Sequence, residues 1–252
     1  MKSEGATFLL AVQFLTRLPV STETVYTPER MAASVRYYPL VGILIGGLCA
    51  AGFFLSDLIF PTVIAVLIAV ASGLLLTGAF HEDGLADTFD GIGGGLTRAK
   101  ALQIMRDSRL GTYGTLALIV AIGVKVLALP ALTPSLICLG LILAHGLSRL
   151  SSVLVIATSS YVRDEGTGKP VAAGVSTLSM LVACATTGGV LAVATLAYAP
   201  VLVLWGLGGL IAGHVLMRLF FEPKLGGYTG DTLGAVQQAS EIGFYLGLLA
   251  WL

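Results

Sequence analysis

Seven long apolar segments divide this chain and constrain its fold more than any other feature. Each is about 20 residues long, the length that an α-helix needs to cross the hydrocarbon core of a bilayer. The connections between them leave no room for a separate soluble domain. We therefore expect one all-α integral membrane domain over residues 1–252, a helix bundle with spans at residues 38–60, 61–80, 111–130, 134–158, 175–199, 200–221 and 232–252.

The composition agrees with a lipid-facing exterior. Hydrophobic residues make up 56% of the chain and charged residues only 11%, whereas soluble domains carry about 25% charged residues. The 14 Lys and Arg balance the 14 Asp and Glu, so there is no basic excess to favour a nucleic acid as partner. The three cysteines stand singly in apolar runs, which predicts neither a disulfide framework nor a zinc site.

The connections between the spans differ sharply in positive charge. Three of them are short turns with prolines and without Lys or Arg, and the others are basic. By the positive-inside rule the basic connections face the cytoplasm. This predicts a multi-pass protein of the cell inner membrane, with an interfacial helix at residues 6–18, an outer C-terminus and an active site at the cytoplasmic mouth. The basic residues are Arg30, Arg36, Arg98, Lys100, Arg106, Arg109, Arg163, Lys169, Arg218 and Lys224.

Glycines at a spacing of four residues predict close helix packing. Gly42 with Gly46, and Gly209 with Gly213, form small-xxx-small patterns that let two helix backbones approach each other in lipid. These faces also leave homo-oligomerisation open.

The segment after the second span carries the strongest chemical signal. Asp83, Asp87 and Asp90 stand at i, i+4 and i+7, which places three carboxylates on one face of a helix. Carboxylates without imidazole or thiolate favour Mg²⁺ or Mn²⁺ over zinc. We expect a metal site there, with Glu82 as a fourth ligand or a supporting group. A solvated acidic helix end is the alternative, but unpaired acids beside a membrane are costly.

A second polar segment precedes the third span. Arg106 and Arg109 are one turn apart and could clamp a phosphate, while Gly111 and Gly114 would let backbone amides approach an anion at a helix start. A diphosphate site is implied; the alternative is a positive-inside anchor, which Arg98 and Lys100 could supply alone. Asp107 is either a further metal ligand or the partner of a neighbouring arginine.

A third segment, residues 224–234, precedes the last span on the same expected face. Lys224, Thr229 and Asp231 could line the mouth, and Thr229 or Asp231 is also suited to cap the last helix. By itself this pattern is weak, and its weight comes from its place beside the other two.

Ionisable groups within the spans are functional candidates or interhelical pairs. They comprise His145 with Arg149, then His214, and Glu241 with its neighbours Gln237 and Gln238. Lys125 lies toward the outer end of its span and is expected to snorkel to the interface.

At these segments the sequence resembles the adenosylcobinamide-GDP ribazoletransferases, the cobalamin synthase family. The resemblance covers residues 80–91, 105–114 and 230–234, together with residues 14–19 near the start, so it spans nearly the whole chain. It implies Mg²⁺-dependent attack of a hydroxyl of α-ribazole, or of α-ribazole 5′-phosphate, on the phosphate attached to cobinamide in adenosylcobinamide-GDP. GMP leaves, and adenosylcobalamin or its 5′-phosphate is formed.

Roles for individual residues follow as a hypothesis from the motifs and this resemblance. Glu82, Asp83, Asp87 and Asp90 hold one or two Mg²⁺ ions, and Arg106 and Arg109 stabilise charge on the phosphoryl oxygens. Asp90 or Asp107 accepts the hydroxyl proton. The remaining residues expected to bind substrate are Arg17, Asp107, Ser108, Gly111, Thr112, Lys224, Thr229 and Asp231.

The sequence leaves two rival functions open. The acidic motif is similar to that of CDP-alcohol phosphotransferases, but no Ala-Arg pair follows Asp83-Gly84, since Ala86 is followed by Asp87. A transporter would carry charges near the midplane on broken helices, whereas the densest motifs here are expected at one mouth.

Overall fold

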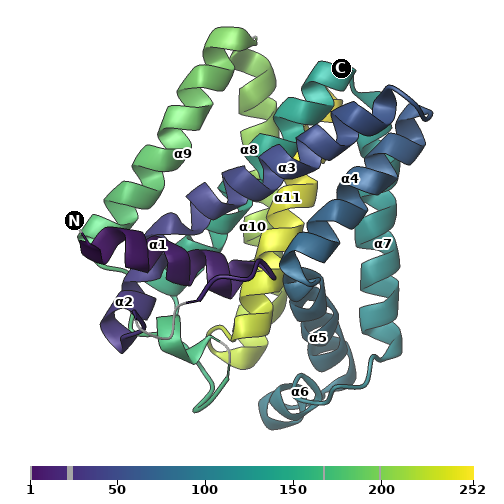
Figure 1. The fold of residues 1–252 in the computed structure, drawn as a ribbon. Helices are drawn as coiled ribbons and strands as arrows, with labels where there is room; N and C mark the ends of the chain where they lie inside the picture. The colour runs from purple at the N-terminus through teal and green to yellow at the C-terminus, as the bar shows by residue number, and fades with distance from the viewer. Residues whose placement is uncertain (1, 22–24, 167, 199) are drawn as a thin grey trace.

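The computed structural model describes residues 2–21, 25–166, 168–198 and 200–252. These residues form α-helices and short 3-10 turns, with no strand among them. The all-α architecture is therefore confirmed (Figure 1). The helices are α1 (Lys2–Leu15), α2 (Pro28–Ala33), α3 (Tyr38–Asp57), α4 (Thr62–Thr77), α5 (Phe80–Gly94), α6 (Arg98–Ile104), α7 (Thr112–Ala128), α8 (Pro134–Thr158), α9 (Thr177–Ala197), α10 (Pro200–Leu225) and α11 (Gly230–Trp251).

Seven of these helices correspond to the seven expected spans. In the described part of the chain, five segments are long and apolar enough to cross a bilayer by themselves: Pro28–Asp57, which contains α2 and α3, Thr112–Ala131, which contains α7, and the helices α8, α9 and α10. The pair α4 and α5 passes only when the two are taken together. The count of seven spans stays a prediction.

The second span is broken, which the sequence analysis did not anticipate. Helix α4 ends at Thr77 and α5 continues at an angle of 87° to it. The break occurs because Gly78 and Ala79 both adopt the left-handed conformation, with φ of 65° and 55°. Glycine tolerates this conformation, but alanine there costs about 1–2 kcal/mol. The acidic motif therefore lies on a helix of its own.

The expected glycine contacts are confirmed. A Cβ added at Gly42 would overlap the carbonyl oxygen of His145 on α8, and one added at Gly209 would overlap that of Gly243 on α11. The helices α3 and α8, and α10 and α11, can therefore approach each other at backbone distance, as small residues permit in membrane bundles.

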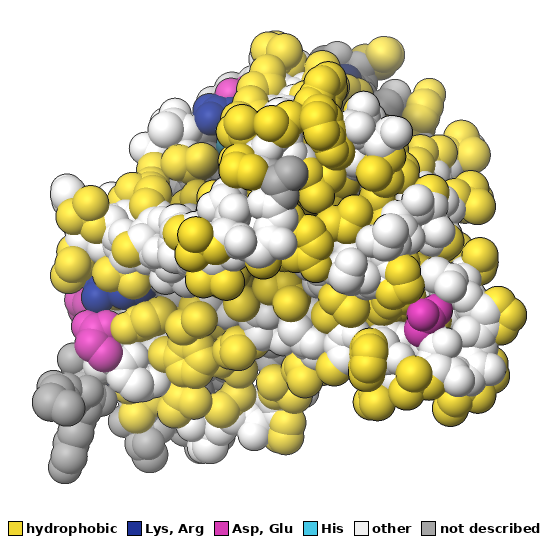
Figure 2. Space-filling model, turned by 90° about the horizontal axis from the view of Figure 1, so that it is seen from above, with side chains coloured by type: hydrophobic (Ala, Val, Ile, Leu, Met, Phe, Trp, Pro, Cys, Tyr) yellow, Lys and Arg dark blue, Asp and Glu magenta, His cyan; other side chains and the backbone are white. Residues whose placement is uncertain are grey.

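The exterior of the bundle is largely apolar. Side chains such as Leu58, Leu75 and Leu196 are 70%, 78% and 89% exposed, and Figure 2 shows one face dominated by hydrophobic side chains. Such a surface suits lipid contact. The ends where α3 meets α4 and α9 meets α10 lie near the C-terminus at the top of Figure 1, whereas α6 lies at the bottom.

Candidate active site

The acidic helix α5 crosses the start of α11 at unusually short range. A Cβ added at Gly84 would lie 2.6 Å from the carbonyl oxygen of Asp231, and one added at Gly234 would lie 2.9 Å from that of His81. Only glycine allows two helices to approach so closely. This crossing brings the acidic motif of α5 to the N-terminus of α11.

Carboxylates from both helices gather at the crossing. Asp231 and Asp83 are the charged groups that act most strongly on Asp87, and Asp90 acts less strongly. Arg163 is the opposing cation, and its Nη2 lies 2.7 Å from Oδ2 of Asp231. Both partners of this ion pair are largely buried, with 7% and 15% of their side chains exposed. The cluster therefore combines several carboxylates with one guanidinium.

Arg163 reaches this position because two loops pair with each other. The backbone N–H of Val162 donates to the carbonyl of Tyr228 at 3.0 Å, and that of Tyr228 donates to Ser160 at 2.9 Å. Gly227 makes this approach possible, since a Cβ there would overlap the Ser160 carbonyl. Sequence reasoning recorded Arg163 only as a basic residue of a connection, because the pairing joins segments that are distant along the chain.

Asp90 accepts two backbone hydrogen bonds. The N–H of Gly111 donates to its Oδ2 at 2.8 Å and the N–H of Gly114 to its Oδ1 at 2.9 Å. A Cβ at either glycine would overlap this carboxylate. The two amides expected to approach a substrate phosphate at the start of α7 donate to the Asp90 carboxyl group instead.

Glu82 points into the bundle and not toward the other acids. Its Oε1 accepts a hydrogen bond from Nε2 of Gln238 at 2.9 Å, and Nζ of Lys125 lies 3.8 Å away. Across the described residues, no three His, Cys, Asp or Glu side chains are grouped as in a metal site. The metal assignment stays a prediction.

The second polar segment forms an irregular loop after α6. Arg109 pairs with Asp107, with 2.6 Å between Nη2 and Oδ2, which is the arginine partnership expected as one alternative for Asp107. The hydrogen bonds from Arg109 lower the pKa of Asp107 to about 2. Arg106 is exposed and lies near enough to Tyr161 to influence it. Ser108 is exposed in the same loop.

The other residues expected to bind substrate are distributed around the same end. Nζ of Lys224 donates to the carbonyl of Ile92 at 2.7 Å. Thr229 caps α11 in a capping box with Thr232. Thr112 is exposed at the first position of α7. Arg17 is also exposed, and its side chain lies over the break between α4 and α5 at Gly78.

The expectation that Lys125 snorkels to the interface is wrong. Its side chain is only 6% exposed, and its Nζ lies 2.7 Å from Oε1 of Glu241. A buried carboxylate attracts the ammonium inward because an unpaired charge in the interior is very costly. The interior of the bundle therefore holds an ion pair as well as the carboxylates near the mouth.

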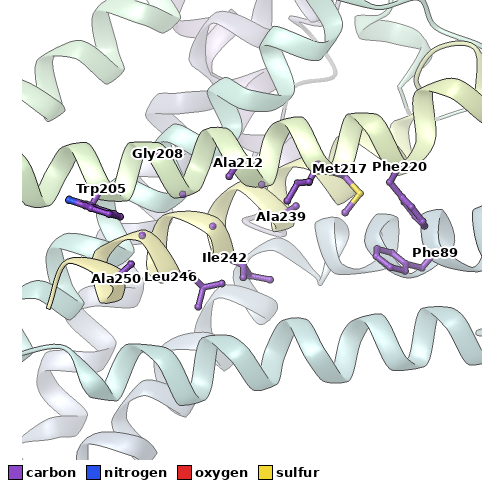
Figure 3. Close-up of a pocket in the computed structure, with 15 residues that line it drawn as sticks. Phe89, Trp205, Gly208, Ala212, Met217, Phe220, Ala239, Ile242, Leu246 and Ala250 are labelled. Atoms are coloured by element: carbon purple, nitrogen blue, oxygen red, sulfur yellow. The ribbon is translucent and has the colours of Figure 1, made fainter.

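An apolar groove of about 720 Å³ runs between α10 and α11 (Figure 3). At one end Phe89 faces Phe220, with ring centroids 4.8 Å apart, and Phe89 directly precedes Asp90. The groove continues past Met217 and Ile242 toward Ala250. Its lining has no charged side chain, so it offers a phosphate no cation.

Comparisons with known proteins decide the family. The profile of the CobS family, described as cobalamin-5-phosphate synthase, matches residues 7–249. This chain belongs to that family. The family resemblance read from the motifs is thus confirmed.

Curated relatives support the same assignment over nearly their full lengths. The adenosylcobinamide-GDP ribazoletransferase of Leptothrix cholodnii is 43% identical, over 98% of this chain and 96% of its own. The protein of the same name from Vibrio cholerae is 44% identical, over 97% and 94%, and that from Shewanella woodyi is 39% identical, over 100% and 98%. No solved structure is a significant match.

Proposed function

We propose that this chain joins adenosylcobinamide-GDP to α-ribazole, or to α-ribazole 5′-phosphate, and releases GMP. The names of the relatives support this reaction, and they do not favour a CDP-alcohol phosphotransferase. The observation that carries the proposal is the group of carboxylates at the crossing of α5 and α11, opposed by one guanidinium. Such a cluster suits phosphoryl transfer, a reaction in which catalysis depends mainly on positioning and electrostatics.

The donor chemistry of this cluster fits Mg²⁺. Asp83, Asp87 and Asp231 offer hard oxygen ligands, and Arg163 is the cation that opposes them. The described side chains are not grouped as in a metal site; we infer that these three carboxylates are the ones that would hold the ion, with Asp90 restrained nearby by the amides of α7. When bound, Mg²⁺ would neutralise the diphosphate and the departing GMP.

The chain's own residues orient the substrates and move the proton. Arg163 restrains Asp231. The exposed Arg106 would meet the phosphoryl oxygens from the loop before α7, and Arg109 would do so once it exchanges Asp107 for the phosphate. The ribazole oxygen forms a bond to the phosphorus attached to cobinamide as the bond from that phosphorus to GMP breaks.

The hydroxyl proton must pass to a base. Asp107 is poorly suited, since its pKa of about 2 is far below neutrality. Both oxygens of Asp90 already accept hydrogen bonds. This leaves Asp83 or Asp87 on α5, whichever keeps an oxygen that the ion does not use, as the better candidate for the proton acceptor.

We also propose that this end of the bundle faces the cytoplasm in the inner membrane. The basic connections carry most of the Lys and Arg, which the positive-inside rule assigns to that side. Adenosylcobinamide-GDP and the ribazole would then bind from the cytoplasm.

An assay of GMP release tests the proposal. The protein, purified in detergent, is incubated with adenosylcobinamide-GDP and α-ribazole, with Mg²⁺ or with EDTA. We expect GMP only when metal and both substrates are present. Release of CMP from a CDP-alcohol without any release of GMP would contradict the substrate assignment, and undiminished turnover in EDTA would contradict the metal.

A further inference from the structure

A network of charged and polar groups lies inside the bundle, behind the acidic motif. Lys125 from α7 contacts Oε1 of Glu241 on α11 at 2.7 Å. Oε2 of Glu241 accepts a hydrogen bond from Gln237 at 2.7 Å, and Gln238 donates to Glu82 on α5 at 2.9 Å. These five residues are 9% exposed or less. The network therefore joins three helices through their interiors.

The charges in this network balance. Lys125 and Arg149 supply two cations against Glu82 and Glu241, and Arg149 is 1% exposed. Nη1 of Arg149 donates to the carbonyl of His145 at 2.8 Å. Ion pairs inside a bundle persist only when each charge is compensated. Because the charges already balance, the network needs no additional cation, which distinguishes it from the cluster at the mouth.

The network also encloses a cavity of about 20 Å³, lined by Glu82, Gln238 and Arg149 among others. Oε2 of Glu82, Oε1 of Gln238 and Nε of Arg149 are buried and have no hydrogen-bond partner in the described part of the chain. A cavity of this size holds about one water molecule.

The two neighbouring acids Glu82 and Asp83 thus face different surroundings. Glu82 is 9% exposed and contacts α7 and α11 in the interior, whereas Asp83 is exposed and acts on Asp87 at the mouth. They are adjacent on a helix, where side chains of consecutive residues point in directions about 100° apart. The inward position of Glu82 fixes the outward position of Asp83.

We propose that Glu82 is a positioning residue and not a metal ligand. Its contacts with Gln238 and Lys125 hold α5 in register on α11 after the break at Gly78–Ala79, and so they set the direction of Asp83 and Asp87. This inference rests on the proposed function, since it takes the carboxylates at the mouth to be the metal ligands.

Binding of Mn²⁺ distinguishes an acid on α5 that is a metal ligand from one that is a positioning residue. Bound Mn²⁺ is measured by electron paramagnetic resonance on the protein in detergent, without substrates. We expect Glu82→Gln to bind Mn²⁺ within about twofold of the wild type, and the matched variant Asp83→Asn to bind at least about tenfold more weakly. Equal weakening in both variants would make Glu82 a ligand and overturn the proposal.

The hydrogen bond to Gln238 is tested by comparing two replacements of Glu82. Glu82→Gln retains an oxygen that can accept from Gln238, whereas Glu82→Leu removes it. We expect GMP release to be at least about tenfold faster in Glu82→Gln than in Glu82→Leu. If both variants lose activity equally, the acceptor oxygen is not what matters, and the proposal fails.

The ion pair is tested by a double-mutant cycle. Lys125→Met leaves Glu241 without its cation, so we expect the unfolding temperature to fall by about 5–10 °C. The single variant Glu241→Gln completes the cycle, and the double variant Lys125→Met/Glu241→Gln should recover most of the loss seen in Lys125→Met. Additive losses would show that the two groups do not pair and would overturn the network. If the wild type binds no Mn²⁺, the metal proposal fails. The cycle and the comparison of Glu82→Gln with Glu82→Leu then still test whether Glu82 positions α5.

Discussion

Replacing Gly84 with alanine tests whether the close crossing of α5 and α11 determines the geometry of the site. The added Cβ would lie 2.6 Å from the carbonyl oxygen of Asp231 and 3.1 Å from its Cα. Backbone atoms cannot rotate away, so the helices must separate by about 0.8 Å to reach the 3.4 Å of an ordinary contact. Overpacking of this kind costs about 1–3 kcal/mol.

The displacement should affect catalysis more than folding. A shift approaching 1 Å between catalytic groups can lower a rate about 100-fold, so we expect GMP release by Gly84→Ala to fall by about 10–100-fold. Gly123→Ala is the matched control, because Gly123 is also helical and a Cβ there meets nothing within 4 Å. That variant should gain up to about 1 kcal/mol from helix propensity.

The assay compares GMP release and the unfolding temperature in detergent for both glycine variants. Gly84→Ala should unfold about 3–10 °C below Gly123→Ala while remaining folded at the assay temperature. Equal activity and equal unfolding temperatures would refute the argument, because they would show that the α5–α11 distance does not set the geometry of the site.

Two further variants test contacts around the same crossing. Arg163→Met removes the cation paired with Asp231 at 2.7 Å, so GMP release should fall at least about tenfold. Arg163→Lys keeps the positive charge and should retain part of the activity. Normal turnover in Arg163→Met would show that the ion pair is not needed. Thr229→Ala removes the N-cap that bonds Thr232, which should cost about 1 kcal/mol and lower the unfolding temperature by about 2–4 °C; an unchanged temperature would exclude this contribution.

The fold was largely predictable because its signals are local. The lengths of the apolar runs set the helices, and prolines mark their starts, as at Pro134 and Pro200. Helical spacing correctly predicted that Asp83, Asp87 and Asp90 share one helix, since all three lie on α5. These features depend on residues that are near one another in the sequence.

The features that sequence reasoning missed depend on contacts between distant segments. No residue near Lys125 in the sequence indicates that Glu241 lies 2.7 Å from it. The pairing of Arg163 with Asp231 likewise depends on contact between two loops that are distant along the chain. The break between α4 and α5 depends on Ala79 in a left-handed conformation, which alanine rarely adopts. Such tertiary effects cannot be predicted from sequence motifs alone.

The most direct test of the account replaces Asp87 with asparagine, which keeps the shape of the side chain and removes its charge. Asp87 is the carboxylate on which Asp83, Asp90 and Asp231 all act. We predict that GMP release in the presence of Mg²⁺ falls at least about 100-fold while the unfolding temperature stays near that of the wild type. The control Asp164→Asn, in an exposed loop, should retain its activity. Near-normal turnover by Asp87→Asn would contradict the claim that the α5 carboxylates carry the chemistry.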